Sequence, residues 1–246
     1  MNKADLLRAL LSLKPTAISV SGAGGKSSFL KFLADNLAAK VVLTTTTHLG
    51  FEQSNLARDH VILEPHERID DNMLAGNTAL LITANHDQAG KWQSLREPQL
   101  FELSERCRNA GKLLVIESDG SRGKPIKAPA GHEPVIPPFV DLCVYILGLS
   151  AVGTPLDTLH AHRPELVAEV TQTNLGDTIS LTTFMELLIS SRAGLKEVPW
   201  LAKRVAILNQ LDVSSVTEER VAAFTKALTD IGYRYVWFGS LKDHFH

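Results

Sequence analysis

The segment 17–30 contains the residues with the clearest chemistry. A short apolar run leads into Gly22, Gly24 and Gly25, then Lys26 and Ser27, and an apolar helical pattern follows. Glycines let phosphate oxygens approach backbone N–H groups, a lysine can neutralise the outer phosphates, and a serine hydroxyl can ligate Mg²⁺. This order of strand, glycine turn, Lys-Ser and helix predicts a phosphate-binding loop. The residues expected to hold the phosphates are Gly22, Ala23, Gly24, Gly25, Lys26, Ser27 and Ser28.

The loop departs from the full phosphate-loop pattern at one position. That pattern has a further glycine five residues before Gly25, where this chain has Val20, so the loop is shortened to Gly22-x-x-Gly25-Lys26-Ser27. An ordinary glycine-rich connection with a chance lysine would give a similar sequence. The strand before the loop and the helix after it favour a site for ATP or GTP with Mg²⁺.

Two acidic residues follow a second apolar run. The run 113–116 leads directly into Glu117, and Asp119 comes two residues later. Phosphate-loop enzymes use a carboxylate at the carboxyl end of a strand to hold Mg²⁺ or to orient a water. We therefore expect Glu117 and Asp119 to act beside Lys26 in catalysis and, with Ser27, to hold the metal. The alternative is an exposed strand end with solvated acids.

Cations are concentrated in the segment after these acids. Arg122, Lys124 and Lys127 come first, and His132 lies further along. Such groups can bind a second anion or stabilise the charge of a transferred phosphoryl group. Arg122 is the strongest candidate for a catalytic role because it is closest to the acids. For the two lysines, solvated loop side chains are the competing interpretation.

Four threonines, ending in His48, follow the apolar run 41–43. Threonine favours strands, so the run is first of all a strand signal. We expect the end of this strand to lie beside the first strand and to face the phosphates. Thr46, Thr47 and His48 would then reach Mg²⁺, a phosphate or a substrate.

Asn209 and Asp212 form an Asn-x-x-Asp pattern at the end of a late apolar run. A carboxylate here can accept hydrogen bonds from N1–H and the exocyclic amine of guanine, a pair that adenine does not offer. Guanine-specific proteins carry Asn-Lys-x-Asp, and this chain has Gln210 in place of the lysine. Because Asn-x-x-Asp also arises by chance, the choice between ATP and GTP stays open, with GTP modestly favoured.

Apolar runs and amphipathic helical patterns alternate along the chain. Strands are expected at 17–21, 41–45, 60–63, 79–83, 112–117, 141–147, 204–208 and 234–239, and helices at 4–12, 27–38, 97–109, 163–172, 181–190 and 217–231. This alternation predicts an α/β fold, with a mostly parallel sheet covered by helices on both faces. We expect a single domain over 1–246, with a helical subdomain or lid at 148–200 and a functional loop at 118–140.

Composition narrows the functional class. The formal net charge of the 246 residues is −2, which argues against a sequence-independent nucleic-acid binder. The two cysteines, Cys107 and Cys143, form neither a disulfide framework nor a zinc pattern and are expected to pack in the core. No apolar run is long enough to cross a bilayer. We expect a cytoplasmic protein without a membrane or nucleic-acid partner.

Taken in order, these segments resemble the YqeC family. The matching stretches are Gly22-Ala-Gly-Gly-Lys-Ser, Thr44-Thr-Thr-Thr-His-Leu, Glu117-Ser-Asp-Gly-Ser-Arg-Gly with Lys127-Ala-Pro-Ala, His132-Glu-Pro-Val-Ile-Pro, and Asn209-Gln-Leu-Asp. The resemblance implies a P-loop NTPase-like protein that binds a nucleotide through the glycine loop. It also implies a role in selenium cofactor biosynthesis, in the maturation of selenium-dependent molybdenum hydroxylases. Gln210, where the family carries lysine, is the departure that bears on the choice of base.

These observations favour a Mg²⁺-dependent NTPase or phosphotransferase, and the resemblance implies a molybdenum hydroxylase or its cofactor as its partner. Phosphoryl transfer needs mainly positioning and charge stabilisation, and the expected residues supply both. Two other classes remain open: a GTP-switched chaperone that docks to a client enzyme, and a small-molecule kinase or nucleotidyltransferase. A binding module without catalysis is disfavoured, because the lysine, the hydroxyl and both acids are present.

Overall fold

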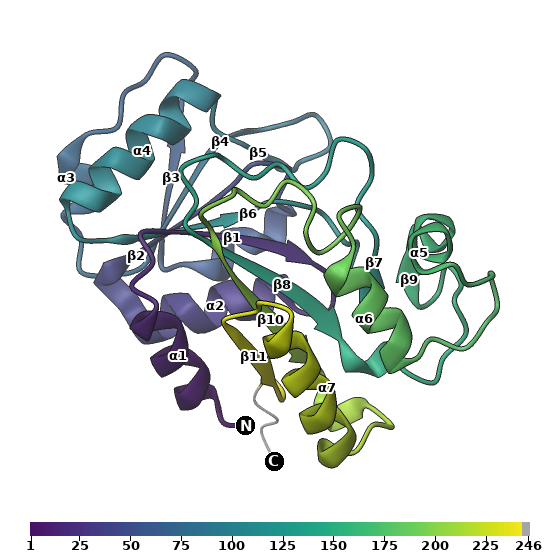
Figure 1. Ribbon diagram of the computed structural model, residues 1–246. Coiled ribbons are helices and arrows are strands. Elements are labelled where there is room, and N and C mark those ends of the chain that lie inside the picture. Colours follow the sequence, from purple (N-terminus) through teal and green to yellow (C-terminus); the bar gives the residue numbers. More distant parts are fainter. Residues whose placement is uncertain (243–246) are drawn as a thin grey trace.

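The computed structural model describes residues 1–242 and contains a central, largely parallel sheet between helices (Figure 1). The main strands, in the order β11-β10-β8-β1-β6-β2-β4-β3, are all parallel to their neighbours. Their bounds are β1 (Ala17–Gly22), β2 (Val41–Thr45), β3 (Asp59–Leu63), β4 (Leu80–His86), β6 (Leu113–Glu117), β8 (Leu142–Gly148), β10 (Lys203–Asn209) and β11 (Tyr235–Phe238). The two-residue β5 (Trp92–Gln93) pairs with β4 in the antiparallel direction.

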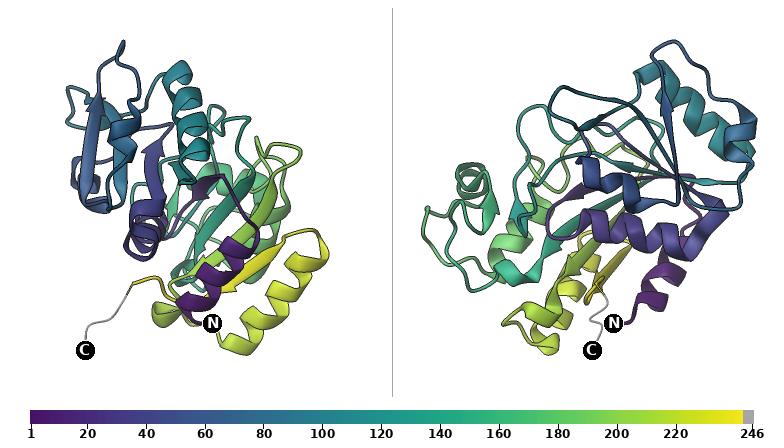
Figure 2. Two further views of the ribbon diagram at one scale, coloured as in Figure 1. Left: turned by 90° about the vertical axis from the view of Figure 1, so that its left-hand side faces the viewer. Right: turned by 180° about the vertical axis from the view of Figure 1, so that it is seen from behind.

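Helices cover both faces of this sheet, as the predicted α/β fold requires. On one face α1 (Lys3–Ser12) and α2 (Lys26–Leu37) pack against alternate residues of the central strands. The right-hand view of Figure 2, which shows the molecule from behind, has α2 in front of the sheet. The opposite face is covered by α4 (Glu97–Asn109) at the β2–β4 end and by α6 (Leu181–Ile189) and α7 (Glu218–Asp230) at the β10–β11 end. The shorter helices are α3 (Asp71–Leu74) and α5 (Pro164–Thr171).

Strand β8 shows how the sequence divides its side chains between the two faces. Leu142, Val144 and Ile146 join the apolar cluster of α1 and α2, whereas Tyr145 and Leu147 join the cluster of α6 and α7. Every residue of β8 is buried, which explains its continuous apolar sequence. The predicted α/β fold is confirmed, and the ends of the expected strands and helices agree with the structure to within three residues.

The expected position of the threonine strand is wrong. β2 pairs with β6 and β4, and β6 lies between β2 and β1. The hydrophobic pattern specifies that a strand is buried, but strand order depends on which crossover connections pack best, so neighbours in sequence need not be neighbours in the sheet. The carboxyl end of β2 therefore lies beside the carboxyl end of β6, where Glu117 is found. It does not lie next to the glycine loop that follows β1.

The proline- and glycine-rich loop and the segment after β8 meet in a second, small sheet. It consists of β7 (Ile126–Lys127) and β9 (Ala161–His162), which are parallel. In segment 148–200, α5 and α6 share an apolar cluster with β8 and β10. Between residues 1 and 242, no helix has both the length and the apolar character needed to span a membrane.

The two cysteines are core residues. Cys107 of α4 and Cys143 of β8 are both buried, and burial raises the pKa of each thiol to about 12. A thiol with so high a pKa carries almost no thiolate near neutral pH, so neither is suited to nucleophilic chemistry. Their packing role agrees with the sequence prediction.

Candidate functional site

The glycine loop connects β1 to the first turn of α2 at the carboxyl edge of the sheet, where open parallel sheets bind ligands. Gly24 has a φ of 79°, and a Cβ built there would lie 2.3 Å from the backbone nitrogen of Gly148. Gly25 has a φ of 138°, and a Cβ there would lie 2.1 Å from Asn209 Nδ2. Glycine is therefore required at both positions, because the loop is pressed against the ends of β8 and β10.

The loop already uses its first three N–H groups within the protein. Gly22, Ala23 and Gly24 donate to the Asp119 carboxylate at 3.0 Å, the Ile146 carbonyl at 2.8 Å and the Lys124 carbonyl at 2.9 Å. The N–H groups in the first turn of an α-helix have no acceptor within the helix, and they attract anions. The donors that remain for phosphate are therefore those of Gly25, the N-cap residue of α2, and of Lys26 to Ser28 in its first turn.

A pocket of about 380 Å³ opens at this helix terminus. Residues Gly24 to Ser28 line it, together with Glu117 of β6 and with Asn209, Gln210 and Asp212 beyond β10. It thus combines segments that are far apart in sequence: the glycine loop, the Asn-x-x-Asp segment, and two of the three expected metal ligands, Ser27 and Glu117.

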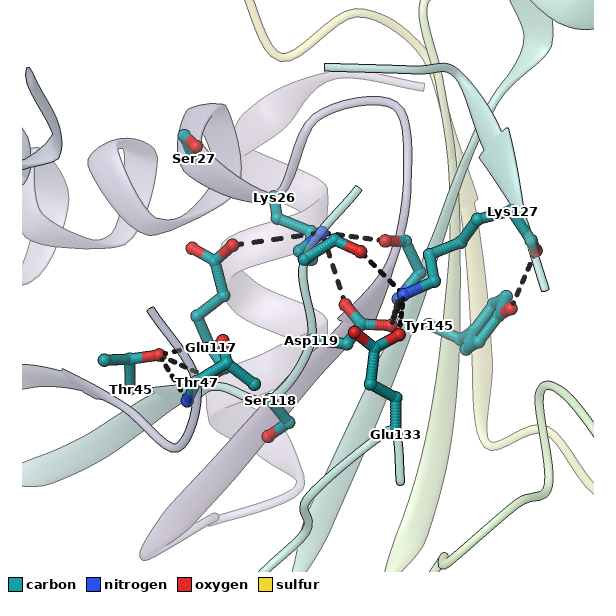
Figure 3. Close-up of polar contacts among 12 residues, drawn as sticks. Lys26, Ser27, Thr45, Thr47, Glu117, Ser118, Asp119, Lys127, Glu133 and Tyr145 are labelled. Atoms are coloured by element: carbon teal, nitrogen blue, oxygen red, sulfur yellow. Dashed lines mark hydrogen bonds and ion pairs between the residues drawn. The ribbon is translucent and has the colours of Figure 1, made fainter. Parts of the chain in front are cut away.

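Lys26 is buried and lies between two carboxylates (Figure 3). Its ammonium donates to the carbonyl of Gly22 at 2.8 Å, and lies 3.2 Å from Asp119 Oδ1 and 3.9 Å from Glu117 Oε1. Burial raises the pKa of Glu117, and the nearby Lys26 ammonium opposes that shift. The structure therefore brings together the three residues Lys26, Glu117 and Asp119.

Lys127 contacts the other oxygen of the same aspartate (Figure 3). Its fully buried ammonium is 3.0 Å from Asp119 Oδ2, and donates to Glu133 Oε2 at 2.7 Å and to the Gly120 carbonyl at 2.6 Å. Two of the three donors of the ammonium are thus used in hydrogen bonds, and the ion pair with Asp119 adds a second buried carboxylate. Arg163 donates to Glu133 at 2.6 Å and 3.3 Å. Positive and negative side chains therefore alternate in a row from Lys26 to Arg163.

This row of alternating charges determines how Glu133 titrates. Burial of Glu133 opposes its ionisation, but hydrogen bonds from Arg163 and Lys127 outweigh burial and lower its pKa to about 2. His162, beside them, has its pKa lowered to about 4 by burial and by the charges of Arg163, Lys127 and Arg122. The folded state is therefore more stable when Glu133 is ionised and His162 is neutral than when either group is protonated.

We expect Glu133 to make the protein sensitive to acid. Its pKa is about 2 in the folded state against an ordinary value of 4.5, so its contribution is complete above about pH 4.5 and is lost as the pH falls toward 2. In urea titrations across this range, the difference in unfolding free energy between the wild type and Glu133→Gln should shrink as the pH falls. A difference that stays constant with pH would contradict the predicted titration.

The Ser27 hydroxyl and the Glu117 carboxylate are brought to a common point by a third residue. Gln53 lies in a short 3₁₀ helix (Phe51–Leu56), and its Nε2 donates to Ser27 Oγ at 2.9 Å and to Glu117 Oε2 at 3.2 Å. A hydroxyl and a carboxylate oxygen that share one small donor fit the oxygen ligands that Mg²⁺ takes in proteins. Within residues 1–242, no cluster of three or more His, Cys, Asp or Glu is arranged to hold a metal.

Asn209 holds the glycine loop from the β10 side. Its side-chain amide donates to the Gly24 carbonyl at 2.7 Å, and its side-chain oxygen accepts from the N–H of Leu241 at 2.8 Å. Asp212 is exposed at the rim of the pocket, where its carboxylate accepts a hydrogen bond from Ser240.

Several residues expected at the site do not line the pocket. Thr46 donates through its hydroxyl to the Val135 carbonyl at 2.7 Å, and the N–H of Thr47 donates to the Thr45 hydroxyl at 3.0 Å. The Lys124 ammonium donates to the Leu159 carbonyl at 2.9 Å.

The other cationic candidates are on the surface. His48 and His132 are exposed and lie 3.9 Å from Asp87 and Glu133, respectively. Arg122 is exposed, and its neighbours Ser121 and Gly123 line the pocket although Arg122 does not. The anion-binding and catalytic roles expected for these residues stay predictions.

Comparison with known proteins identifies the family. A model of the family described as YqeC protein matches residues 18–165. The chain is 30% identical over 240 residues to the uncharacterized protein YqeC of Escherichia coli (strain K12), an alignment that covers 94% of this chain and 90% of the relative. No solved structure gives a significant match. Both the family match and the relative lead to the same conclusion: this chain belongs to the YqeC family.

Proposed function

We propose that this protein binds a purine nucleoside triphosphate with Mg²⁺ and hydrolyses it or transfers its terminal phosphoryl group. The observation that carries the proposal is the convergence of Lys26, Ser27 and Glu117 on one pocket at the amino terminus of α2. A buried lysine, a hydroxyl, a carboxylate and a helix terminus are the groups that phosphoryl transfer requires.

In this proposal each residue has a distinct role. The N–H groups at the start of α2 and the Lys26 ammonium bind the phosphates, and Lys26 exchanges its contact with Glu117 for phosphate oxygens. Ser27 and Glu117 hold Mg²⁺, which neutralises charge on the phosphates when it is bound. Asp119 positions the loop, because it accepts the N–H of Gly22 at 3.0 Å and lies 3.2 Å from Lys26.

The base is proposed to lie against the end of β10, with GTP preferred over ATP. Asp212 lies at the rim of the pocket, and in this proposal its carboxylate accepts hydrogen bonds from guanine. Gln210 also lines the pocket, and its Oε1 accepts a hydrogen bond from the Ser150 hydroxyl at 2.6 Å.

A further part of the proposal concerns the cellular role. The resemblance to the YqeC family implies maturation of selenium-dependent molybdenum hydroxylases, and we propose that the nucleotide-dependent step serves this process. The core location of Cys107 and Cys143 argues against either thiol as a selenium carrier.

Calorimetric titration with non-hydrolysable analogues of GTP and ATP, in Mg²⁺ and in EDTA, tests the proposal. We expect binding that depends on Mg²⁺, with GTP ahead of ATP. Loss of a hydrogen bond to a charged group should make Asp212→Asn bind GTP about 10- to 100-fold more weakly while ATP binding changes little. Absence of binding by both nucleotides would overturn the proposal, and equal loss for GTP and ATP in Asp212→Asn would remove the base assignment.

A further inference from the structure

Gln53 lies at the point where the proposed cation ligands meet. Its Nε2 is 2.9 Å from Ser27 Oγ and 3.2 Å from Glu117 Oε2, so one NH₂ group is shared by both oxygens. The sequence separations are 26 and 64 residues, and the contacts join three separate elements: α2, β6 and the 3₁₀ helix after β2.

The orientation of this amide is fixed from the other side. Gln53 Oε1 accepts from the N–H of Gly50 at 2.7 Å, in the turn that starts the 3₁₀ helix. Since the oxygen is committed to Gly50, the NH₂ group faces Ser27 and Glu117. The helix is itself held in place, because Trp92 stacks on Phe51 with ring centroids 5.4 Å apart and donates through Nε1 to the Phe51 carbonyl at 3.3 Å.

A cation that contacts both oxygens competes with this NH₂ group for the same space. Mg²⁺ binds oxygen at about 2.0–2.1 Å, and an ion bound to both Ser27 Oγ and Glu117 Oε2 would lie where the amide nitrogen now approaches them. The amide carries only a partial positive charge, so a divalent ion assisted by nucleotide phosphates displaces it, whereas an ion alone competes poorly.

We propose that Gln53 occupies the cation position of the nucleotide-free protein and leaves it when the cation binds, so that Gln53 lowers the affinity for cation in the absence of nucleotide. The identity of the cation as the partner of a bound nucleotide rests on the proposed function. The competition itself rests only on Gln53, Ser27 and Glu117. Its effect is to favour the metal–nucleotide complex over the free metal as the species that binds.

The test is a titration with Mn²⁺ alone, followed by electron paramagnetic resonance of the free ion, in the wild type and in Gln53→Ala. Mn²⁺ takes the same oxygen ligands as Mg²⁺ and is directly observable. Removing the competing hydrogen bonds should tighten Mn²⁺ binding about 3- to 10-fold. Unchanged or weaker binding in Gln53→Ala would overturn the proposal, since weaker binding would make Gln53 a ligand rather than a competitor.

Gln99 provides a matched control. Its side-chain oxygen accepts from the N–H of Arg96 at 3.2 Å at the start of α4, as Gln53 does for Gly50, and its NH₂ donates to the carbonyls of Glu64 and Glu67. Gln99→Ala therefore removes the same kind of helix cap away from the pocket, and its Mn²⁺ affinity should equal that of the wild type. An increase in Gln99→Ala equal to that in Gln53→Ala would also overturn the proposal.

A parallel titration with GTP and ATP distinguishes failure of the proposed function from failure of the proposed role of Gln53. If no variant binds nucleotide but Gln53→Ala still binds Mn²⁺ more tightly, the proposed function fails and the role of Gln53 holds. If nucleotide binds and the Mn²⁺ affinities are equal, the role of Gln53 fails and the proposed function holds.

Discussion

Replacing Lys26 with methionine is expected to weaken binding of the Mg²⁺–nucleotide complex by about 100-fold or more, because charge-assisted hydrogen bonds to phosphate are among the strongest that a protein makes. Methionine has a similar length but cannot donate to phosphate oxygens. Calorimetric titration measures the loss, and circular dichroism shows whether the variant stays folded. A folded Lys26→Met protein that binds nucleotide within threefold of the wild type would contradict the assigned role.

Two further variants make this result interpretable. Lys26→Arg keeps the positive charge between Asp119 and Glu117 but changes the geometry of the donors, so we expect it to stay folded and still bind nucleotide poorly. Lys31→Met removes an exposed lysine of the same helix, where it pairs with Asp35. Because it lies outside the pocket, its nucleotide affinity should match that of the wild type.

Replacing Lys127 with methionine is expected to lower the free energy of unfolding by about 3–5 kcal/mol. The ammonium is fully buried and compensates two carboxylates, at 3.0 Å from Asp119 and 2.7 Å from Glu133. Without it, each of these buried carboxylates loses a cationic partner, although Asp119 still lies beside Lys26 and Glu133 beside Arg163. Urea denaturation of the variant and the wild type at neutral pH measures the difference.

Lys124→Met is the comparison for this effect. Lys124 lies three residues earlier in the same loop, but its ammonium makes a single hydrogen bond, to the Leu159 carbonyl. We expect its loss to cost about 1 kcal/mol or less. If both substitutions had small effects on stability, the network around Asp119 would not be the structural element that its geometry indicates.

The hydrophobic pattern was sufficient to predict the longer helices and strands of the fold, but not the short elements α3, β5, β7 and β9. Strands such as β8 are buried on both faces, so their apolar runs are continuous and their ends are marked by turn residues. The two-residue strands β7 and β9 carry no such periodicity, and only their tertiary pairing creates them. The hydrophobic pattern also does not specify the order of the strands in the sheet, so β2 was wrongly expected beside β1.

Local sequence motifs were sufficient to predict part of the candidate site. The loop from Gly22 to Ser28 and the acids Glu117 and Asp119 follow strands, and parallel strands bring their carboxyl ends to one edge of the sheet. Gln53 gave no signal, because a glutamine in a short 3₁₀ helix resembles any surface residue until folding places it against Ser27. Lys127 looked like a loop cation, but its side chain is completely buried and pairs with Asp119 and Glu133.

The position of β6 between β1 and β2 has a consequence for how the chain assembles. Once residue 86 has been synthesised, β2, β4 and β3 can already pair with one another, but both sheet neighbours of β1, β6 and β8, are still to come. Native hydrogen bonding of β1 must therefore wait for residues 113–117 and 142–148, and contacts of this separation form late because a long loop has to close. The glycine loop therefore leaves the ribosome before either of the strands that hold β1 in the sheet has been made.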